Sequence, residues 1–160
     1  GEELSECITT GIELHYRGQQ SAAIEALRTC DNVHEALRWI GLAELAAGQF
    51  DAARRTLLAS VDLFPRNRCR TEFNEITRRV AASEPGVHLL DLAAAVNEGA
   101  ADGVPGRDLF VDVCHMNRTG YSLVGRAMWT ELAALRGLGP SGIPAPAPAT
   151  VGAAQGIPLP

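Results

Sequence analysis

The chain has 160 residues and a mass of 17.0 kDa, enough for one domain or two small ones. Hydrophobic residues make up 46%, charged residues 21% and aromatic residues 5%, which excludes a collagen-like chain and wholesale disorder. The net charge of -5 and the pI of about 5.3 exclude a general binder of nucleic acid or of anionic membranes. We therefore expect a folded chain with no nucleic-acid partner.

The sequence carries no recognisable membrane or export signal. No apolar run reaches the roughly 18 residues that a transmembrane helix needs, so no membrane span is expected. The first residues, GEELSEC, are acidic, whereas a secretory signal begins with a basic segment. The chain begins with Gly1 rather than Met, so we expect its natural start to lie upstream, and the cellular location stays open.

The four cysteines, at positions 7, 30, 69 and 114, are scattered along the chain. No two of them form a C-x-x-C pair, and no histidine lies near them at zinc-finger spacing. This pattern signals neither a zinc site nor a disulfide framework. We therefore predict buried free thiols, no bound metal and no cofactor.

The first half of the chain contains an internal repeat. The segments GIELHYRGQQSAAIEAL and GLAELAAGQFDAARRTL align without a gap. Four residues recur 30 positions later: Gly11, Gly18, Ala23 and Leu27 return as Gly41, Gly48, Ala53 and Leu57. Each copy is predicted to form two amphipathic helices joined by a glycine turn. Asn32, followed three residues later by Glu35, is typical of a helix N-cap and marks the start of the second copy.

After Pro65 the pattern changes. A helix is predicted over FNEITRRVAAS, then a turn at EPG and a doubly buried strand over VHLLDL. A helix over about 91–98, a loop and a last helix capped by Asn117 follow. The buried stripe of the last helix is predicted to contain Leu123, Ala127, Leu132 and Leu135. The Pro- and Gly-rich segment from about Gly137 onward is predicted to be disordered.

The strongest chemical signal is the pair Asp112 and His115 in the loop before the last helix. An Asp three residues before a His can accept the imidazole Nδ1 proton, which leaves Nε2 as a general base for a serine hydroxyl. The spacing therefore suits the orienting member and the base of a catalytic triad. The alternative is a capping Asp beside a loop His that has no chemical role.

Other polar and aromatic positions have weaker functional interpretations. Arg66, Arg68 and Arg70 form a basic cluster that could bind an anionic group of a substrate; a solvated helix end is the alternative. His88 is predicted to be packed within the strand, and Asp91 to cap the helix after it. The two tryptophans, Trp39 and Trp129, are predicted to be core or groove residues, and His15 and His34 receive no function.

The second repeat resembles a tetratricopeptide repeat. It spans about 34–67, the family length of 34 residues, and the resemblance is carried by Leu37, Ile40, Gly41, Gly48, Phe50, Ala53, Leu57 and Pro65. The first copy departs from the pattern, because it is shorter and no proline closes it. The resemblance implies a helical face that could hold a protein or peptide.

The later segment resembles the last block of the SGNH, or GDSL, serine ester hydrolases. The similarity covers about 73–135 and is carried by NEITRRVAASEPGVHLLDL, PGRDLF and LFVDVCHMNRTGYSLVGRAM, with Met116 where a proline is often found. It implies that His115 is the base and Asp112 its partner. The family's Gly-Asp-Ser nucleophile block and its Gly and Asn oxyanion blocks are absent from this chain. In some members, helical repeats precede the terminal block, which is the order found here.

These observations together predict an α plus α/β chain. Two tetratricopeptide-like hairpins occupy 1–67, the C-terminal part of a flavodoxin-like SGNH fold occupies 68–136, and a disordered tail occupies 137–160. The predicted function is the C-terminal portion of an ester hydrolase, acting on an ester whose identity stays open. The alternative is a repeat module for protein interaction that carries an inactive hydrolase remnant.

Overall fold

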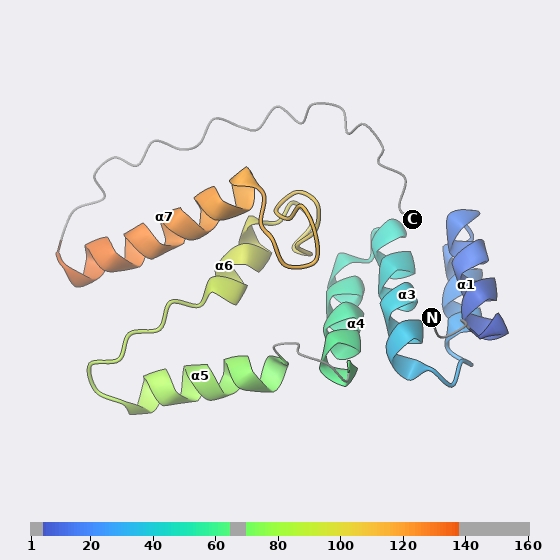
Figure 1. Ribbon diagram of the computed structural model, residues 1–160, viewed down its shortest axis with the longest axis horizontal. Coiled ribbons are helices and arrows are strands. Elements are labelled where there is room, and N and C mark those ends of the chain that lie inside the picture. Colours follow the sequence, from blue (N-terminus) through green and yellow to red (C-terminus); the bar gives the residue numbers. More distant parts are fainter. Residues whose placement is uncertain (1–4, 65–69, 138–160) are drawn as a thin grey trace. The chain divides into compact units, whose positions relative to one another are not determined.

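The computed structural model describes residues 5–64 and 70–137, and within these ranges the chain is mostly helical (Figure 1). The described residues contain seven helices and no paired strands apart from one isolated antiparallel bridge, between Phe110 and Met116. They fall into two compact units. One runs to Leu89 and includes 102–104, and the other consists of 90–101 and the residues from 105 onward.

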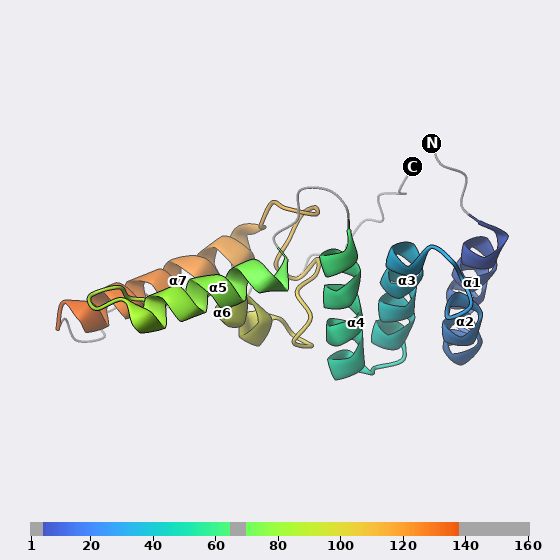
Figure 2. The same cartoon turned by 90° about the horizontal axis from the view of Figure 1, so that it is seen from below.

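The first unit begins with two helical hairpins. The helices α1 (Glu6–Tyr16) and α2 (Gln20–Leu27) form the first, and α3 (Val33–Ala46) and α4 (Phe50–Leu63) form the second. Figure 2 shows these four helices lying side by side. The turns contain Gly18 and Gly48, whose φ angles of 75° and 73° lie in the left-handed region that glycine adopts most easily. The predicted pairs of helices are therefore present.

The same contact recurs in both hairpins and explains the spacing of the repeat. Gly11 of α1 lies against the side chain of Leu27 in α2, and Gly41 of α3 lies against Leu57 in α4. A Cβ atom at either glycine would overlap the leucine, so only glycine allows the helices to approach this closely. The 30-residue repeat is thus a repeat of helix packing.

The core of the hairpins is built from Ile8, Leu27, Cys30, Ala36 and Ile40. Trp39 packs against it and is partly buried, in agreement with its predicted core or groove position. The predicted cap is also present, because the Asn32 side chain accepts a hydrogen bond from the Glu35 amide at 3.3 Å. The hairpins therefore close an apolar core of their own.

The prediction of buried free thiols is wrong for three of the four cysteines. Cys7 and Cys30 form a disulfide that ties α1 to the end of α2, and Cys114 is exposed. The antiparallel packing of the two helices brings the Cα atoms of Cys7 and Cys30 to 5.7 Å, within the range a disulfide requires. Their separation of 23 residues hides this proximity in the sequence. Cys69 lies outside the described residues.

The helix α5 (Thr71–Ser83) contains no buried residue. Its apolar side chains Phe73, Ile76 and Val80 follow helical spacing and are 56%, 39% and 50% exposed. Within its unit, α5 makes no extensive contact with the hairpin helices. An amphipathic helix of this kind presents an apolar face that the described residues of its unit leave uncovered.

The predicted strand over VHLLDL is wrong for this chain. Residues 87–91 are neither helical nor paired as a strand, and Val87, His88 and Leu89 are exposed. A doubly buried parallel strand needs neighbouring strands, and no other strand exists among the described residues. His88 is therefore not packed in a core, which corrects its predicted environment. Asp91 behaves as predicted, because its side chain caps the next helix by accepting from the Ala94 amide at 3.0 Å.

The second unit is built on α6 (Leu92–Gly99) and α7 (Arg118–Leu135). Its core contains Val96, Ala100 and Leu109, with Leu123 of α7 packed against them. The predicted burial of Leu132 and Leu135 in the later turns of α7 is wrong, because these side chains are 52% and 47% exposed. The eight residues of α6 are too few to cover an 18-residue partner. Trp129 of α7 is 37% exposed, which differs from its predicted core or groove position, whereas Ala133 further along the helix is buried.

Some predictions fall on residues that the structure does not describe. Arg66, Arg68 and the predicted tail beyond Gly137 lie outside the described ranges, together with Pro65 of the second repeat. Where helices are described, none combines the length and the apolar character needed to cross a membrane.

Candidate functional site

Asp112 and His115 lie in the loop between α6 and α7, and this loop is fixed at its base by side chains. The carboxylate of Asp108 accepts hydrogen bonds from the amides of Ala101 and Gly106, at 3.2 and 2.9 Å. The amide group of Asn117 donates to the carbonyls of Arg107 and Asp108, at 3.1 and 2.9 Å. These bonds tie the start of the loop, at Ala101, and its end, at Asn117, to Asp108 in its middle.

Asn117 also begins the last helix, as predicted. Its side-chain oxygen accepts a hydrogen bond from the amide of Gly120 at 3.0 Å, the contact expected of an N-cap. A Cβ atom at Gly120 would overlap the carbonyl oxygen of Leu109, a buried residue of the unit core. Glycine at this position therefore lets the first turn of α7 approach the loop closely.

The top of the loop is closed by backbone contacts. The amide of Val111 donates to the carbonyl of His115 at 2.9 Å, and the bridge between Phe110 and Met116 lies beside it. The four residues from Asp112 to His115 form the tip of this closed turn. Their positions are set by the fold of the loop, although their side chains face solvent.

The carboxylate of Asp112 is held in place by backbone amides of its own loop. One carboxylate oxygen, Oδ1, accepts hydrogen bonds from the amides of Cys114 at 2.9 Å and His115 at 2.8 Å. These backbone donors, together with the imidazole of His115, hold the pKa of the Asp112 carboxyl well below its usual range. The carboxylate is therefore ionised over the whole physiological pH range.

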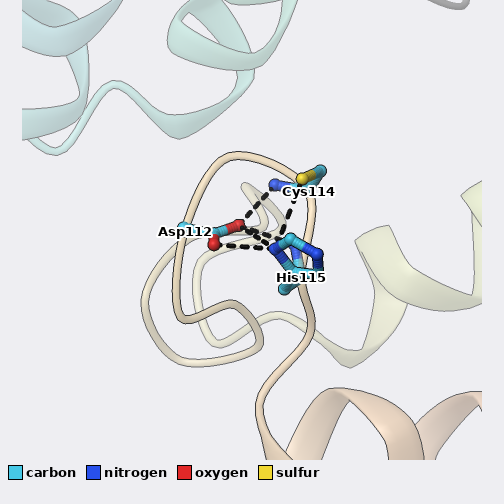
Figure 3. A group of neighbouring side chains, drawn as sticks. All are labelled: Asp112, Cys114 and His115. Carbon is cyan, nitrogen blue, oxygen red and sulfur yellow. Dashed lines mark hydrogen bonds and ion pairs between the residues drawn. The ribbon is translucent and has the colours of Figure 1, made fainter.

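The imidazole of His115 is paired with this carboxylate (Figure 3). Its Nδ1 lies 2.7 Å from Oδ2 and 3.0 Å from Oδ1 of Asp112. Because an ionised carboxylate only accepts hydrogen bonds, Nδ1 carries the proton of this contact. Nε2 lies on the side of the ring away from Asp112. The structure thus brings the two residues together, while their role in catalysis stays a prediction.

Cys114 is a part of this site that the sequence analysis missed. Its Sγ lies 3.4 Å from His115 Nδ1, and all three side chains of the tip are exposed. The sequence carries one signal of its role, because Cys114 stands between the Asp and the His in D-V-C-H.

An open pocket of about 580 Å³ adjoins the tip and has Asp112 in its wall. Its lining is largely apolar and includes one cation, the guanidinium of Arg107. The lining residues are Pro105, Gly106, Arg107, Phe110, Val111, Asp112 and Val113. Such a hollow suits an apolar group with a polar or anionic end.

The serines of the described residues do not complete a triad. None of their hydroxyls is hydrogen-bonded to His115, whose imidazole contacts are with Asp112 and Cys114. Ser5 caps α1, and Ser60 is buried with its hydroxyl donating to the carbonyl of His34. Arg70, the one described member of the predicted basic cluster, is exposed and precedes α5. The structure assigns it no ligand.

Comparison of the chain with protein-family models, with curated proteins and with solved structures finds no match. The functional interpretation therefore depends on the geometry of the loop and on the resemblance described for its sequence.

Proposed function

We propose that this chain is the C-terminal portion of an SGNH-type serine ester hydrolase. In this proposal His115 is the general base, Asp112 orients it, and the nucleophilic serine comes from a segment outside the chain. The observation that carries the proposal is the hydrogen bond of 2.7 Å between His115 Nδ1 and Asp112 Oδ2, at the tip of a loop fixed at its base. This arrangement leaves Nε2 available for a serine hydroxyl.

The uncovered apolar faces support a missing segment. The face of α5 with Phe73 and Val80, and the outer part of α7 with Leu132 and Leu135, each expose about half of their large apolar side chains. Faces of this kind are normally buried against another layer of the fold. In an α/β hydrolase that layer would be the sheet.

The mechanism follows from the pair. His115 Nε2 takes the proton of the serine hydroxyl while the serine oxygen attacks the ester carbonyl carbon. The imidazolium then gives this proton to the departing alcohol oxygen. In the second half of the reaction, His115 takes a proton from water while the water oxygen attacks the acyl carbon, and it returns the proton to the serine oxygen as the acid leaves. The Asp112 carboxylate stabilises the imidazolium and holds the tautomer, without accepting the proton itself. The pocket beside Asp112 would receive an apolar part of the ester.

The test is complementation with a second polypeptide that carries the segment encoded upstream of Gly1. We expect the chain alone to hydrolyse p-nitrophenyl esters at background rates, because loss of a triad nucleophile costs about a million-fold in turnover. The mixture should be active. In it, His115→Ala should abolish activity, and Asp112→Asn should lower it by about ten thousand-fold through the wrong tautomer.

The matched controls are His88→Ala and Asp102→Asn, which change an exposed residue of the same type outside the loop tip. Both should leave the activity of the mixture unchanged. Absence of a Gly-Asp-Ser block upstream, or hydrolysis by the chain alone that His115→Ala does not affect, would contradict the proposal.

A second candidate is a tetratricopeptide-type interaction module that carries an inactive hydrolase remnant. It is favoured by two neighbouring aromatic side chains, Tyr16 of α1 and Trp39 of α3, whose ring centroids lie 6.1 Å apart. Tyr16 is 73% exposed. The guanidinium of Arg38 lies 5.5 Å from the Trp39 ring centroid. Aromatic and Arg side chains are enriched in protein interfaces. Peptide-library binding that is lost in Tyr16→Ala, without esterase activity in the complementation test, would favour this candidate.

A further inference from the structure

The tip of the loop brings together three different metal-binding groups. The carboxylate of Asp112, the thiol of Cys114 and the imidazole of His115 each place one donor atom within 4.8 Å of the other two. They come from four consecutive residues, so their proximity depends only on the fold of this turn. Figure 3 shows the three side chains gathered on the tip.

This donor set suits a cation of the zinc class. Thiolate and imidazole ligands favour zinc and its neighbours over magnesium or calcium, and carboxylate is a regular third ligand. In a tetrahedral zinc site with bonds of about 2.0–2.3 Å, neighbouring donor atoms lie roughly 3.3–3.5 Å apart. The distance from Cys114 Sγ to His115 Nδ1 is already 3.4 Å.

The remaining adjustment is small. The Asp112 Oδ2 atom lies 2.7 Å from His115 Nδ1. In a tetrahedral zinc site these two atoms would lie roughly 3.3 Å apart, so the carboxylate has to move away by a little over half an ångström. Asp112 Oδ1 meanwhile accepts the amides of Cys114 and His115, which keeps the carboxylate oriented toward the other two donors. Because the side chains are exposed, they can make this shift without disturbing a core.

We propose that Asp112, Cys114 and His115 bind a divalent cation of the zinc class, with three protein ligands and a fourth position open to solvent. Binding releases the thiol proton of Cys114 to the solvent, and the ring proton of His115 moves from Nδ1 to Nε2 by exchange with water, so that Nδ1 can bind the cation. The cation then takes the nitrogen that otherwise pairs with Asp112. The metal site does not depend on the proposed function. Its consequence, that the metal-bound protein cannot orient His115 as a base, rests on the proposed function.

The experiment is a titration of the full chain, free of any affinity tag, with cobalt(II) as a spectroscopic substitute for zinc. We expect absorption from thiolate-to-cobalt charge transfer, and loss of this band when zinc is added. Cys114→Ser should remove the band. His115→Ala should weaken cobalt binding by more than the about 10–100-fold that loss of an outer-shell partner costs.

Two matched variants give the controls. Cys69→Ser changes the remaining cysteine that is not in the disulfide, and His88→Ala changes an exposed histidine outside the tip. Both should bind cobalt like the unmodified chain. Absence of the charge-transfer band, or a band that survives Cys114→Ser and disappears in Cys69→Ser, would overturn the proposal. Circular dichroism of each variant checks that its helices are retained.

The outcomes separate this proposal from the proposed function. If the upstream polypeptide restores esterase activity, zinc should inhibit it. Cys114→Ser should then reduce the sensitivity to zinc by more than the about ten-fold that loss of an outer-shell partner costs. If no activity is restored, the cobalt titration still tests the metal site. Activity that zinc leaves unchanged at concentrations that fill the site would overturn the regulatory consequence alone.

Discussion

The hairpins α1–α4 and the helices α5 and α7 are all amphipathic, but they differ in how much of their apolar surface the described fold buries. In the hairpins, Leu27 has no exposed surface and Ile8 is 1% exposed. In α7, Leu132 is 52% exposed, and α5 contains no buried residue. The same type of helix thus forms a closed core in one region and an open face in the other.

This difference shows that a helical pattern predicts which face of a helix is apolar, but not what covers that face. In the hairpins the partner is the next helix of the repeat, and Gly11 and Gly41 let it approach closely. In the second unit, α6 covers only the start of α7. The open faces are therefore where a further segment of a larger fold would contribute most to stability.

The largest contrast is expected from leucine truncation. Leu27→Ala removes a fully buried side chain and should lower the free energy of unfolding by about 4 kcal/mol. Leu132→Ala removes a half-exposed one and should change it by less than about 0.5 kcal/mol in this chain. Urea unfolding followed by circular dichroism measures both. Equal losses would show that α7 is covered in solution.

The hairpins could be predicted from the sequence because their packing depends on residue types that recur. Gly11 and Gly41, each opposite a leucine, indicate that two helices approach closely. Asn32 and Asn117 indicate where helices begin. The contact between Asp112 and His115 follows from short-range spacing in one turn. These features depend on local geometry that a single sequence contains.

The features that the sequence did not reveal depend on partners far along the chain. The Cys7–Cys30 disulfide needs two helices to pack antiparallel before the thiols meet. The predicted strand from Val87 to Leu92 needs neighbouring strands, which the described residues do not supply. The missed member of the site, Cys114, has a contact within the turn, but its role depends on what binds there.

Reduction of the disulfide should weaken the closed region and spare the open one. Loss of the Cys7–Cys30 bond, which closes a loop with a sequence separation of 23, should cost about 3 kcal/mol. Hydrogen exchange in α1 and α2 should rise on reduction, whereas exchange in α7 should not change. Alkylation of the unreduced protein provides the control: modification of Cys7 and Cys30 before reduction would contradict the bond.

A glycine pair tests whether close packing distinguishes the two regions. Gly41→Val should cost about 2 kcal/mol, because the new side chain overlaps Leu57. Gly125→Ala in α7 should be neutral or stabilise by up to about 1 kcal/mol, because nothing lies within 4 Å and alanine favours the helix. Thermal unfolding of both variants measures the difference. A destabilised Gly125→Ala would show that this part of α7 is packed against something.

The smallest expected effect is the pH response of the loop tip, where Asp112 is exposed and its contacts are local. The amides of Cys114 and His115 favour the ionised carboxylate, so the folded pKa lies below the ordinary value of 3.8. A depressed pKa stabilises the loop at pH above the unfolded value, and this contribution is lost only as pH falls through the folded pKa. The tip should therefore keep its hydrogen bonds from neutral pH down to below pH 3.8.

Carbon-13 NMR of the Asp112 carboxyl measures this directly, because amide shifts in the turn also respond to the neighbouring imidazole. In Asp112→Asn the carboxyl is absent, so the low-pH step in the amide shifts of Cys114 and His115 should disappear. A carboxyl that titrates at or above 3.8 would mean that the two backbone hydrogen bonds do not persist in solution. The imidazole would then lose the partner that orients it, because the same hydrogen bonds hold the Asp112 carboxylate in place.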